Sequence, residues 1–164
     1  TGISPGSGGT GRDVEAGGRW GDRWTPADAT RFNAEAKKFG AQYAAVKVVP
    51  GAHINPDLTM GENIADFAGL NVALDAYHKS LDGKDAPVID GLTGAERFFL
   101  SWAQAWQQKG RDEEVIRLVA IDPHSPNEFR CNQIVRNIDG YYDTFTLTAS
   151  DELWLDPEER VTIW

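Results

Sequence analysis

Apolar residues recur at helical spacing along most of the chain. The first helix is expected from Thr25 to about Tyr43, with Phe32, Ala36 and Phe39 on one face. The threonine can cap this helix, and the proline that follows it suits the first helical turn. The pattern therefore predicts an amphipathic helix that begins close to residue 25.

A second helix is expected over about residues 60–80. Before it, valines followed by Pro50-Gly51 predict a short extended segment and a turn. The apolar residues of this helix recur too often for it to be fully solvated, and they are Ile64, Phe67, Leu70, Val72, Leu74 and Tyr77. We therefore expect part of the helix to be buried.

Two further helices are expected at 93–109 and 112–121. Thr93 and Glu96 form a capping-box pattern at the start of the first. Its aromatic residues predict a heavily buried helix, and they are Phe98, Phe99, Trp102 and Trp106. The prolines of residues 122–126 interrupt the pattern. Ser125 is expected to cap the helix that follows.

The remaining residues predict one more short helix, around Tyr141 to Phe145, and an irregular segment over 146–164. The pattern as a whole predicts a mainly α fold with one helical domain, residues 25–164. Residues 1–24 differ, since eight of the 17 glycines lie in the first 21 positions. Such a stretch has little to bury, so we expect an arm or linker.

Composition narrows the possible functions. The chain has 164 residues, of which 41% are hydrophobic, and this suits one domain with a real core. A net charge of −9 argues against a nucleic-acid partner, which would require a basic surface. No apolar run approaches the length of about 20 residues that spans a bilayer, so no membrane span is expected. Cys131 is the only cysteine and is expected to be a small buried apolar group.

Glu62 and Asp66 are the most informative polar residues. They are four positions apart, so they share one face of the second helix. Carboxylates in a partly buried setting require hydrogen-bond donors or a cation, and zinc is one suitable cation. The alternative is a solvated helix start, where the helix dipole favours acidic residues.

The histidines do not form a cluster in the sequence. His53 lies in a polar loop and is expected to be exposed. His78 lies about 24 Å of helix rise from Glu62, which is too far to share a site through this helix. His124 lies in the proline-rich turn, and Arg130 follows on the next helix. Taken alone, a histidine in such a turn is usually a structural hydrogen bonder and such an arginine is usually solvated, so a functional role is the less common interpretation.

Several motifs, in this order, resemble the neprilysin and endothelin-converting-enzyme family of zinc metallopeptidases over roughly residues 11–164. They are Gly61-Glu62-Asn63-Ile64-Ala65-Asp66-Phe67-Ala68-Gly69-Leu70, Gly91-Leu92-Thr93-Gly94, Arg97-Phe98-Phe99-Leu100, Trp102-Ala103-Gln104, Asp122-Pro123-His124-Ser125-Pro126, Phe129-Arg130 and the terminal Trp164. The resemblance implies the C-terminal lobe of a thermolysin-like (gluzincin) metallopeptidase. It also implies that the complete enzyme hydrolyses peptides and uses zinc.

The resemblance assigns a role to each of four residues. Glu62 would be a zinc ligand, and Asp66 would orient a histidine that binds the metal. His124 would donate to the oxyanion of the tetrahedral intermediate, and Arg130 would hold a backbone carbonyl of the substrate.

The His-Glu-x-x-His motif of the family is absent from the chain. Thr1, Gly2 and Pro5 stand where the two histidines and the catalytic glutamate would be. The chain is then a truncated piece behind a linker, an engineered fragment, or a natural homologue whose motif has decayed. One carboxylate should not hold zinc tightly, so we expect no appreciable peptidase activity from this chain by itself.

Three functional hypotheses follow. The first is a portion of an extracytoplasmic zinc endopeptidase, secreted, periplasmic or membrane-anchored, that acts on peptides and is completed by the N-terminal part of its parent protein. The second is a non-catalytic peptide-binding module that keeps His124 and Arg130. The third is a helical packing module without a ligand site.

Overall fold

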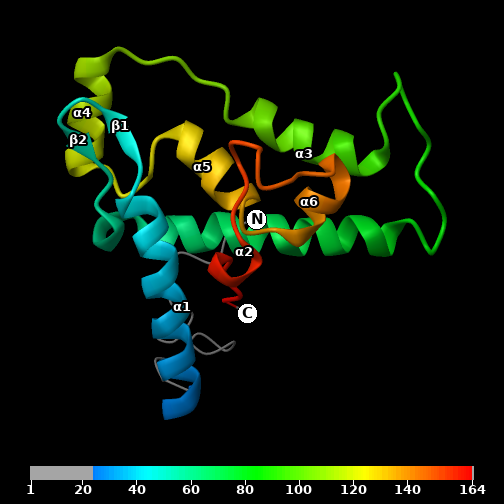
Figure 1. Ribbon diagram of the computed structural model, residues 1–164, viewed down its shortest axis with the longest axis horizontal. Helices are drawn as coiled ribbons and strands as arrows, with labels where there is room; N and C mark the ends of the chain where they lie inside the picture. The colour runs from blue at the N-terminus through cyan, green and yellow to red at the C-terminus, as the bar shows by residue number, and fades with distance from the viewer. Residues whose placement is uncertain (1–23, 164) are drawn as a thin grey trace, which may run out of the picture.

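Helices dominate the molecule, as expected for a mainly α fold (Figure 1). The computed structural model describes residues 24–163. In chain order the elements are α1 (Pro26–Ala44), β1 (Lys47–Val49), β2 (Ala52–His53), α2 (Pro56–Ser80), α3 (Gly94–Ala105), α4 (Asp112–Ile121), α5 (Asn127–Val135), α6 (Asp139–Phe145) and the 3-10 helix η2 (Pro157–Glu159). The glycine-rich segment expected over residues 1–24 lies outside the described residues, apart from Trp24.

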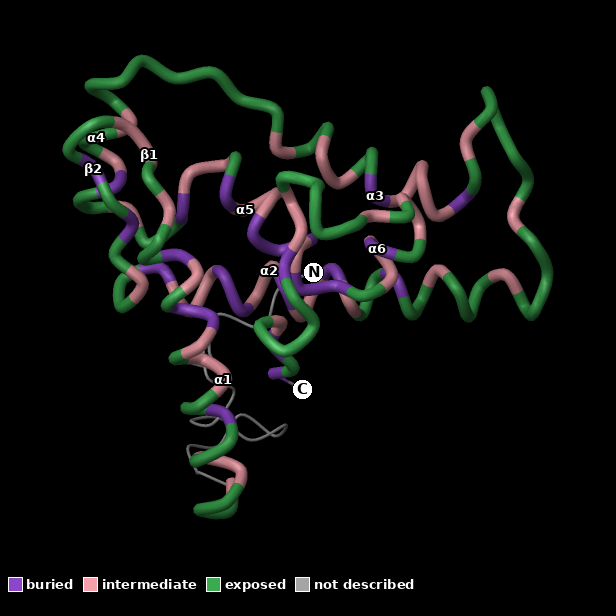
Figure 2. The backbone as a smooth tube through the Cα atoms, viewed as in Figure 1, coloured by how far each residue is buried: buried purple, intermediate pink, exposed green. Residues whose placement is uncertain are grey.

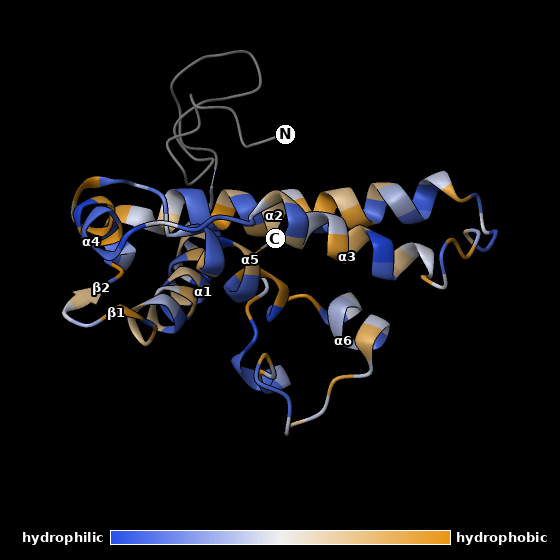
Figure 3. Cartoon of the chain, turned by 90° about the horizontal axis from the view of Figure 1, so that it is seen from above, coloured by the Kyte–Doolittle hydropathy of each residue, from blue (hydrophilic) through white to orange (hydrophobic). Residues whose placement is uncertain are grey.

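The 25-residue helix α2 is the axis of the fold. Helix α1 packs against it and projects away from one end, where the antiparallel pair β1–β2 contacts α4 (Figure 1). Helix α5 packs against both α1 and α2, and α6 packs against α3. Hydrophobic residues occur at several points around α2 (Figure 3), which suits a helix with more than one neighbour.

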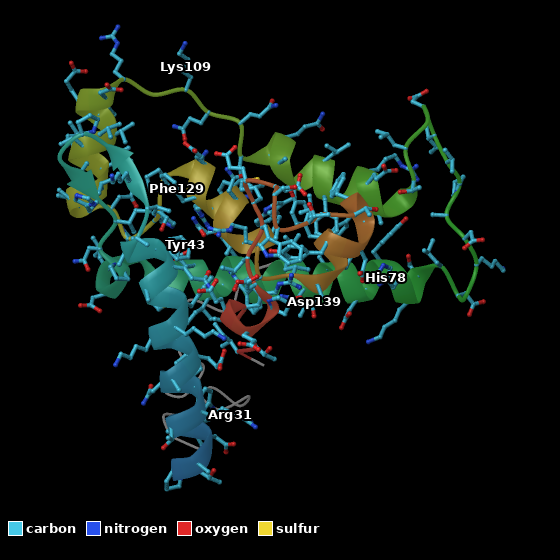
Figure 4. The ribbon with its side chains drawn as sticks, in the orientation of Figure 1. Arg31, Tyr43, His78, Lys109, Phe129 and Asp139 are labelled. Atoms are coloured by element: carbon cyan, nitrogen blue, oxygen red, sulfur yellow. The ribbon has the colours of Figure 1, made fainter. Side chains whose placement is uncertain are left out.

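The core lies where α1, α2 and α5 meet, and Figure 2 shows buried segments on all three. Its most deeply buried apolar side chains are Phe39, Tyr43, Ile64 and Ile134. The Tyr43 hydroxyl donates to the backbone carbonyl of Phe129 at 3.5 Å, so this buried polar group has a partner (Figure 4). These contacts hold α5, which carries Arg130, against both α1 and α2.

Two helix caps agree with the sequence. Thr25 and Thr93 each accept a hydrogen bond from the third residue of their helix, and both form complete capping boxes. Helix α2 starts earlier than expected, at Pro56, because Asn55 accepts a hydrogen bond from the backbone N–H of Asp57.

The expectation of a heavily buried helix over residues 93–109 is wrong. Helix α3 ends at Ala105, and only Gly94 and Phe99 are buried on it. Its other aromatic residues are half-buried, because α6 is the helix that packs closely against α3 and it covers one side.

Cys131 was expected to be a buried apolar group, but it is only partly buried.

Candidate functional site

Glu62 and Asp66 lie on the side of α2 that faces α3 and α5. The side chain of Asp66 is 11% exposed, whereas that of Glu62 is 45% exposed. The two carboxylates therefore experience different surroundings, although they are one helical turn apart. Asp66 requires a partner within the protein, and Glu62 remains open to solvent.

The partner of Asp66 is Arg130 on α5. Nε of Arg130 donates to Oδ2 of Asp66 at 2.6 Å, and Nη2 donates to Oδ1 at 2.8 Å. The guanidinium carbon also lies 4.2 Å from the centre of the Trp106 ring, at cation–π distance. Burial raises the pKa of Asp66, and the hydrogen bonds from Arg130 oppose that rise. The pair is planar, two-pronged and largely shielded from water.

His124 is fixed in its turn by Asp122. Oδ1 of Asp122 accepts from the backbone N–H of His124 at 2.9 Å and lies 2.7 Å from Nδ1. The backbone hydrogen bond from His124, followed by the side-chain one, lowers the pKa of Asp122. An ionised carboxylate only accepts, so Nδ1 carries a proton and donates it. Nε2 then lies 3.4 Å from Oε2 of Glu62.

Ser125 does not cap α5, contrary to the expectation from sequence. The N-cap position is Pro126, and no side chain caps the helix. The Ser125 hydroxyl instead donates to Oδ1 of Asn63 on α2 at 2.8 Å. A serine hydroxyl can either cap a helix or form a hydrogen bond with a distant part of the fold. Here the buried side-chain amide of Asn63 lies within hydrogen-bond distance.

The structure thus brings together all four side chains that the resemblance singled out. It also adds three that sequence reasoning did not assign to the site, Asp122, Asn63 and Trp106. The contact of Asp122 with His124 could have been predicted from the sequence, because an aspartate side chain often accepts a hydrogen bond from the backbone N–H two residues later in a turn. The contacts of Asn63 and Trp106 could not have been predicted in this way, because they join distant parts of the chain. His78 lies near the far end of α2 (Figure 4). His53 is exposed on β2.

The described residues do not by themselves fit a zinc ion. Catalytic zinc takes three protein ligands and a water. Across residues 24–163, no group of three or more histidine, cysteine, aspartate or glutamate side chains could hold a metal. Both oxygens of Asp66 are bonded to Arg130, and Asp122 lies on the Nδ1 side of the His124 ring, so among the described residues Glu62 is the carboxylate beside Nε2 of His124.

A groove of about 680 Å³ runs from this site between α2 and α3. Glu62, Asp66 and Arg130 line one part of it, and its walls are mainly small and aromatic residues: Ala65, Gly69, Leu70, Ala73, Tyr77, Gly94, Arg97, Phe98, Ser101, Trp102 and Ala105. The indole N–H groups of Trp102 and Trp106 are buried without a hydrogen-bond partner among the described residues. The walls of the groove are therefore mainly apolar, with Glu62, Asp66 and Arg130 in one part of it and Arg97 in another.

The curated relatives of the chain include neutral endopeptidases and neprilysins. Neutral endopeptidase of Lactobacillus helveticus is 35% identical over 142 residues, which are 86% of this chain and 20% of that protein. Neprilysin-1 of Caenorhabditis elegans is 33% identical over 168 residues, which cover 99% of this chain and 22% of that protein. The chain therefore spans about a fifth of the length of these relatives.

Solved structures agree with the same kinship. Mycobacterium tuberculosis zinc metalloprotease Zmp1, crystallised in complex with an inhibitor, is 49% identical with a TM-score of 0.91; the match covers 94% of this chain and 24% of Zmp1. PepO of Lactobacillus rhamnosis HN001 is 32% identical with a TM-score of 0.74, over 90% of this chain and 22% of PepO. The sequence profile of Peptidase family M13 matches residues 6–161. The chain belongs to peptidase family M13, the family of its neprilysin and neutral endopeptidase relatives.

Proposed function

We propose that this chain contributes one zinc ligand and the substrate-binding side chains to a zinc metalloendopeptidase. The observation that carries the proposal is the convergence of Glu62 and Asp66 with His124 and Arg130, which come from separate parts of the chain. The remaining zinc ligands and the catalytic base would come from other sequence of the enzyme. The same kinship supports an extracytoplasmic location, on a secreted, periplasmic or membrane-anchored protein. Within residues 24–163, no helix has the length and apolar character needed to cross a membrane.

Each side chain has a part that suits its geometry. The side chain of Glu62 is 45% exposed, so a metal can reach its oxygens without breaking a buried ion pair such as that of Asp66. His124 presents Nε2 beside Glu62, and when protonated this nitrogen is an N–H donor for an oxyanion. Arg130 uses Nε and Nη2 for Asp66, which leaves Nη1 for a peptide carbonyl. Because the described residues do not form a zinc site alone, no hydrolytic step is assigned to them.

The α2–α3 groove would receive another helix or strand of the complete enzyme. Gly69 supports this, because a Cβ at this position would meet no atom within 4 Å. Glycine in a helix interior costs about 1 kcal/mol relative to alanine, and no contact within the described chain requires it. A close neighbouring backbone would require it.

A chimera with Zmp1 tests the proposal. The matching quarter of Zmp1 is replaced by residues 24–163 of this chain, and zinc content and cleavage of a quenched fluorescent peptide are measured. We expect zinc-dependent cleavage, and we expect Glu62→Gln to remove both zinc and activity. Glu113→Gln, an exposed carboxylate on α4, is the matched control and should change neither. A folded chimera that keeps its zinc and its activity with Glu62→Gln contradicts the proposal.

The 164-residue chain alone separates the remaining hypotheses. Calorimetric titration with zinc should show no tight one-to-one binding, and the same peptide should stay intact. Tight zinc binding with cleavage would show that the chain is catalytic by itself. Peptide binding without zinc that disappears in Arg130→Ala would favour the non-catalytic peptide-binding module, because Arg130 is already held in place by Asp66 without a metal.

A further inference from the structure

A buried hydrogen bond joins the residues that directly follow Glu62 and His124. Asn63 follows Glu62 and is 0% exposed; Ser125 follows His124 and is 2% exposed. The Ser125 hydroxyl donates to the Asn63 side-chain oxygen at 2.8 Å, across 62 residues of sequence. This is a direct link between α2 and the turn before α5.

The direction of every bond in this link is fixed. Thr59 donates its hydroxyl proton to the backbone carbonyl of Asn55 at 3.1 Å, so its oxygen accepts from the Asn63 amide, also at 3.1 Å. The Asn63 oxygen is then left to accept from Ser125. Thr59 is 3% exposed, so its bond with Asn63 and the bond between Asn63 and Ser125 are shielded from water, and the bond to the Asn55 carbonyl is partly buried. Such a satisfied buried network holds one arrangement, because any other leaves polar groups unpaired.

The attraction between Glu62 and His124 is too weak to fix their separation by itself. The side chains of Glu62 and His124 are 45% and 44% exposed, and Oε2 of Glu62 lies 3.4 Å from Nε2 of His124. Exposed pairs of this kind contribute little, because water screens the attraction and both side chains lose freedom. Asp122 orients the His124 ring, but it lies in the same turn and does not tie that turn to α2. The tie has to come from elsewhere.

We propose that Asn63 and Ser125 are positioning residues that set the separation between Glu62 and His124. This inference rests on the proposed function, in which Glu62 binds zinc and His124 faces the reacting carbonyl. The buried bond fixes the two backbones one residue away from each functional side chain. Arg130 and Asp66 join α5 to α2 one turn further along, and they leave the turn at His124 to be fixed by Ser125.

NMR on the 164-residue chain tests this without requiring activity. With labelled histidine and glutamate, a nuclear Overhauser cross-peak is expected between the His124 ring and the Glu62 γ-methylene. It should be lost in Ser125→Ala and kept in Ser125→Thr, which retains the hydroxyl. Ser80→Ala is the matched control, because it removes an exposed hydroxyl at the end of α2 and should leave the cross-peak unchanged.

Two results would overturn the inference: absence of the cross-peak in the unmodified chain, or its full retention in a folded Ser125→Ala. If Ser125→Ala does not fold, Ser125→Cys replaces it, since a thiol is a weaker donor of similar size; the cross-peak should then weaken. In the Zmp1 chimera, Ser125→Ala should lower kcat while KM stays nearly constant. A chimera without zinc-dependent cleavage would defeat the proposed function, and the NMR result would still decide the positioning role.

Discussion

Arg130 shows how differently two ion pairs of the same type can behave. Its pair with Asp66 is 15% and 11% exposed, whereas the pair of Arg117 and Glu114 on α4 is 56% and 51% exposed. Both are two-pronged, with N–O distances of 2.6 to 2.8 Å. Their surroundings, rather than their geometry, should therefore decide what each contributes.

Arg130→Ala is expected to lower the free energy of unfolding by about 3–5 kcal/mol, because it leaves a buried carboxylate without a partner. Arg117→Ala should cost less than about 1 kcal/mol, because both groups are open to water. Urea unfolding followed by tryptophan fluorescence measures both. Equal losses would show that the Asp66 site is wetter than its burial indicates.

The cost of Arg130→Ala should also depend on pH. Burial raises the pKa of Asp66, so the folded state takes up the proton more readily than the unfolded state. The contribution of Asp66 to stability is therefore complete below the unfolded pKa and declines as pH rises through the folded pKa. Loss of Arg130 increases the upward shift. We expect the variant to lose less stability near about pH 4 than near about pH 7, and a pH-independent loss in urea unfolding would contradict this.

At the level of elements, two glycines line the α2–α3 groove. A Cβ at Gly94, in the first turn of α3, would collide with the Tyr77 hydroxyl and would lie 2.6 Å from Cβ of Ala86. A Cβ at Gly69, in the middle of α2, would meet nothing within 4 Å. The first glycine is required by contacts inside the chain, and the second is not.

Alanine at these positions should have opposite effects. Gly94→Ala is expected to destabilise the chain by about 1–3 kcal/mol through overpacking. Gly69→Ala should stabilise it by about 0.4–1 kcal/mol, because alanine favours the helix and restricts the unfolded chain. Thermal unfolding monitored by circular dichroism measures both. In the Zmp1 chimera Gly69→Ala should instead reduce stability, and a gain there would argue against a close neighbour in the groove.

At the level of the whole molecule, Asn137 connects the C-terminal segment to helix α1. Its amide oxygen accepts from Gln42 on α1 and from the backbone N–H of Val161, both at 3.0 Å. Its amide nitrogen donates to the Gln42 side chain at 2.7 Å and to the Gln133 carbonyl at 2.8 Å. All of its hydrogen-bonding capacity is used, and it is 5% exposed.

Asn137→Leu should therefore release the C-terminal segment. We expect a loss of about 1–3 kcal/mol, because buried groups are left without partners. Hydrogen exchange should accelerate over residues 157–163 more than in the core of α2. Lys109→Leu, a surface replacement in the segment before α4 (Figure 4), is a control that should leave exchange unchanged. Uniform acceleration throughout the chain would mean that Asn137 supports the whole fold rather than this segment.

The sequence by itself determined the local features of this protein. Caps at Thr25 and Thr93 depend on residues within one turn, so they could be predicted from spacing. The mainly α fold followed from apolar periodicity, and the family followed from ordered motifs that include Glu62 and His124. These features are encoded in short stretches, where the physics that selects them is also local.

Only the tertiary structure decided which elements meet. Periodicity shows that a helix has an apolar face but not what covers it, so α3 was expected to be buried and instead lines a groove. A hydroxyl bonds equally well to its own helix or to a distant amide, and Ser125 took the distant one. The Asp66–Arg130 pair likewise joins positions 64 residues apart. Such contacts depend on how α2 and α5 pack, which no short segment of sequence specifies.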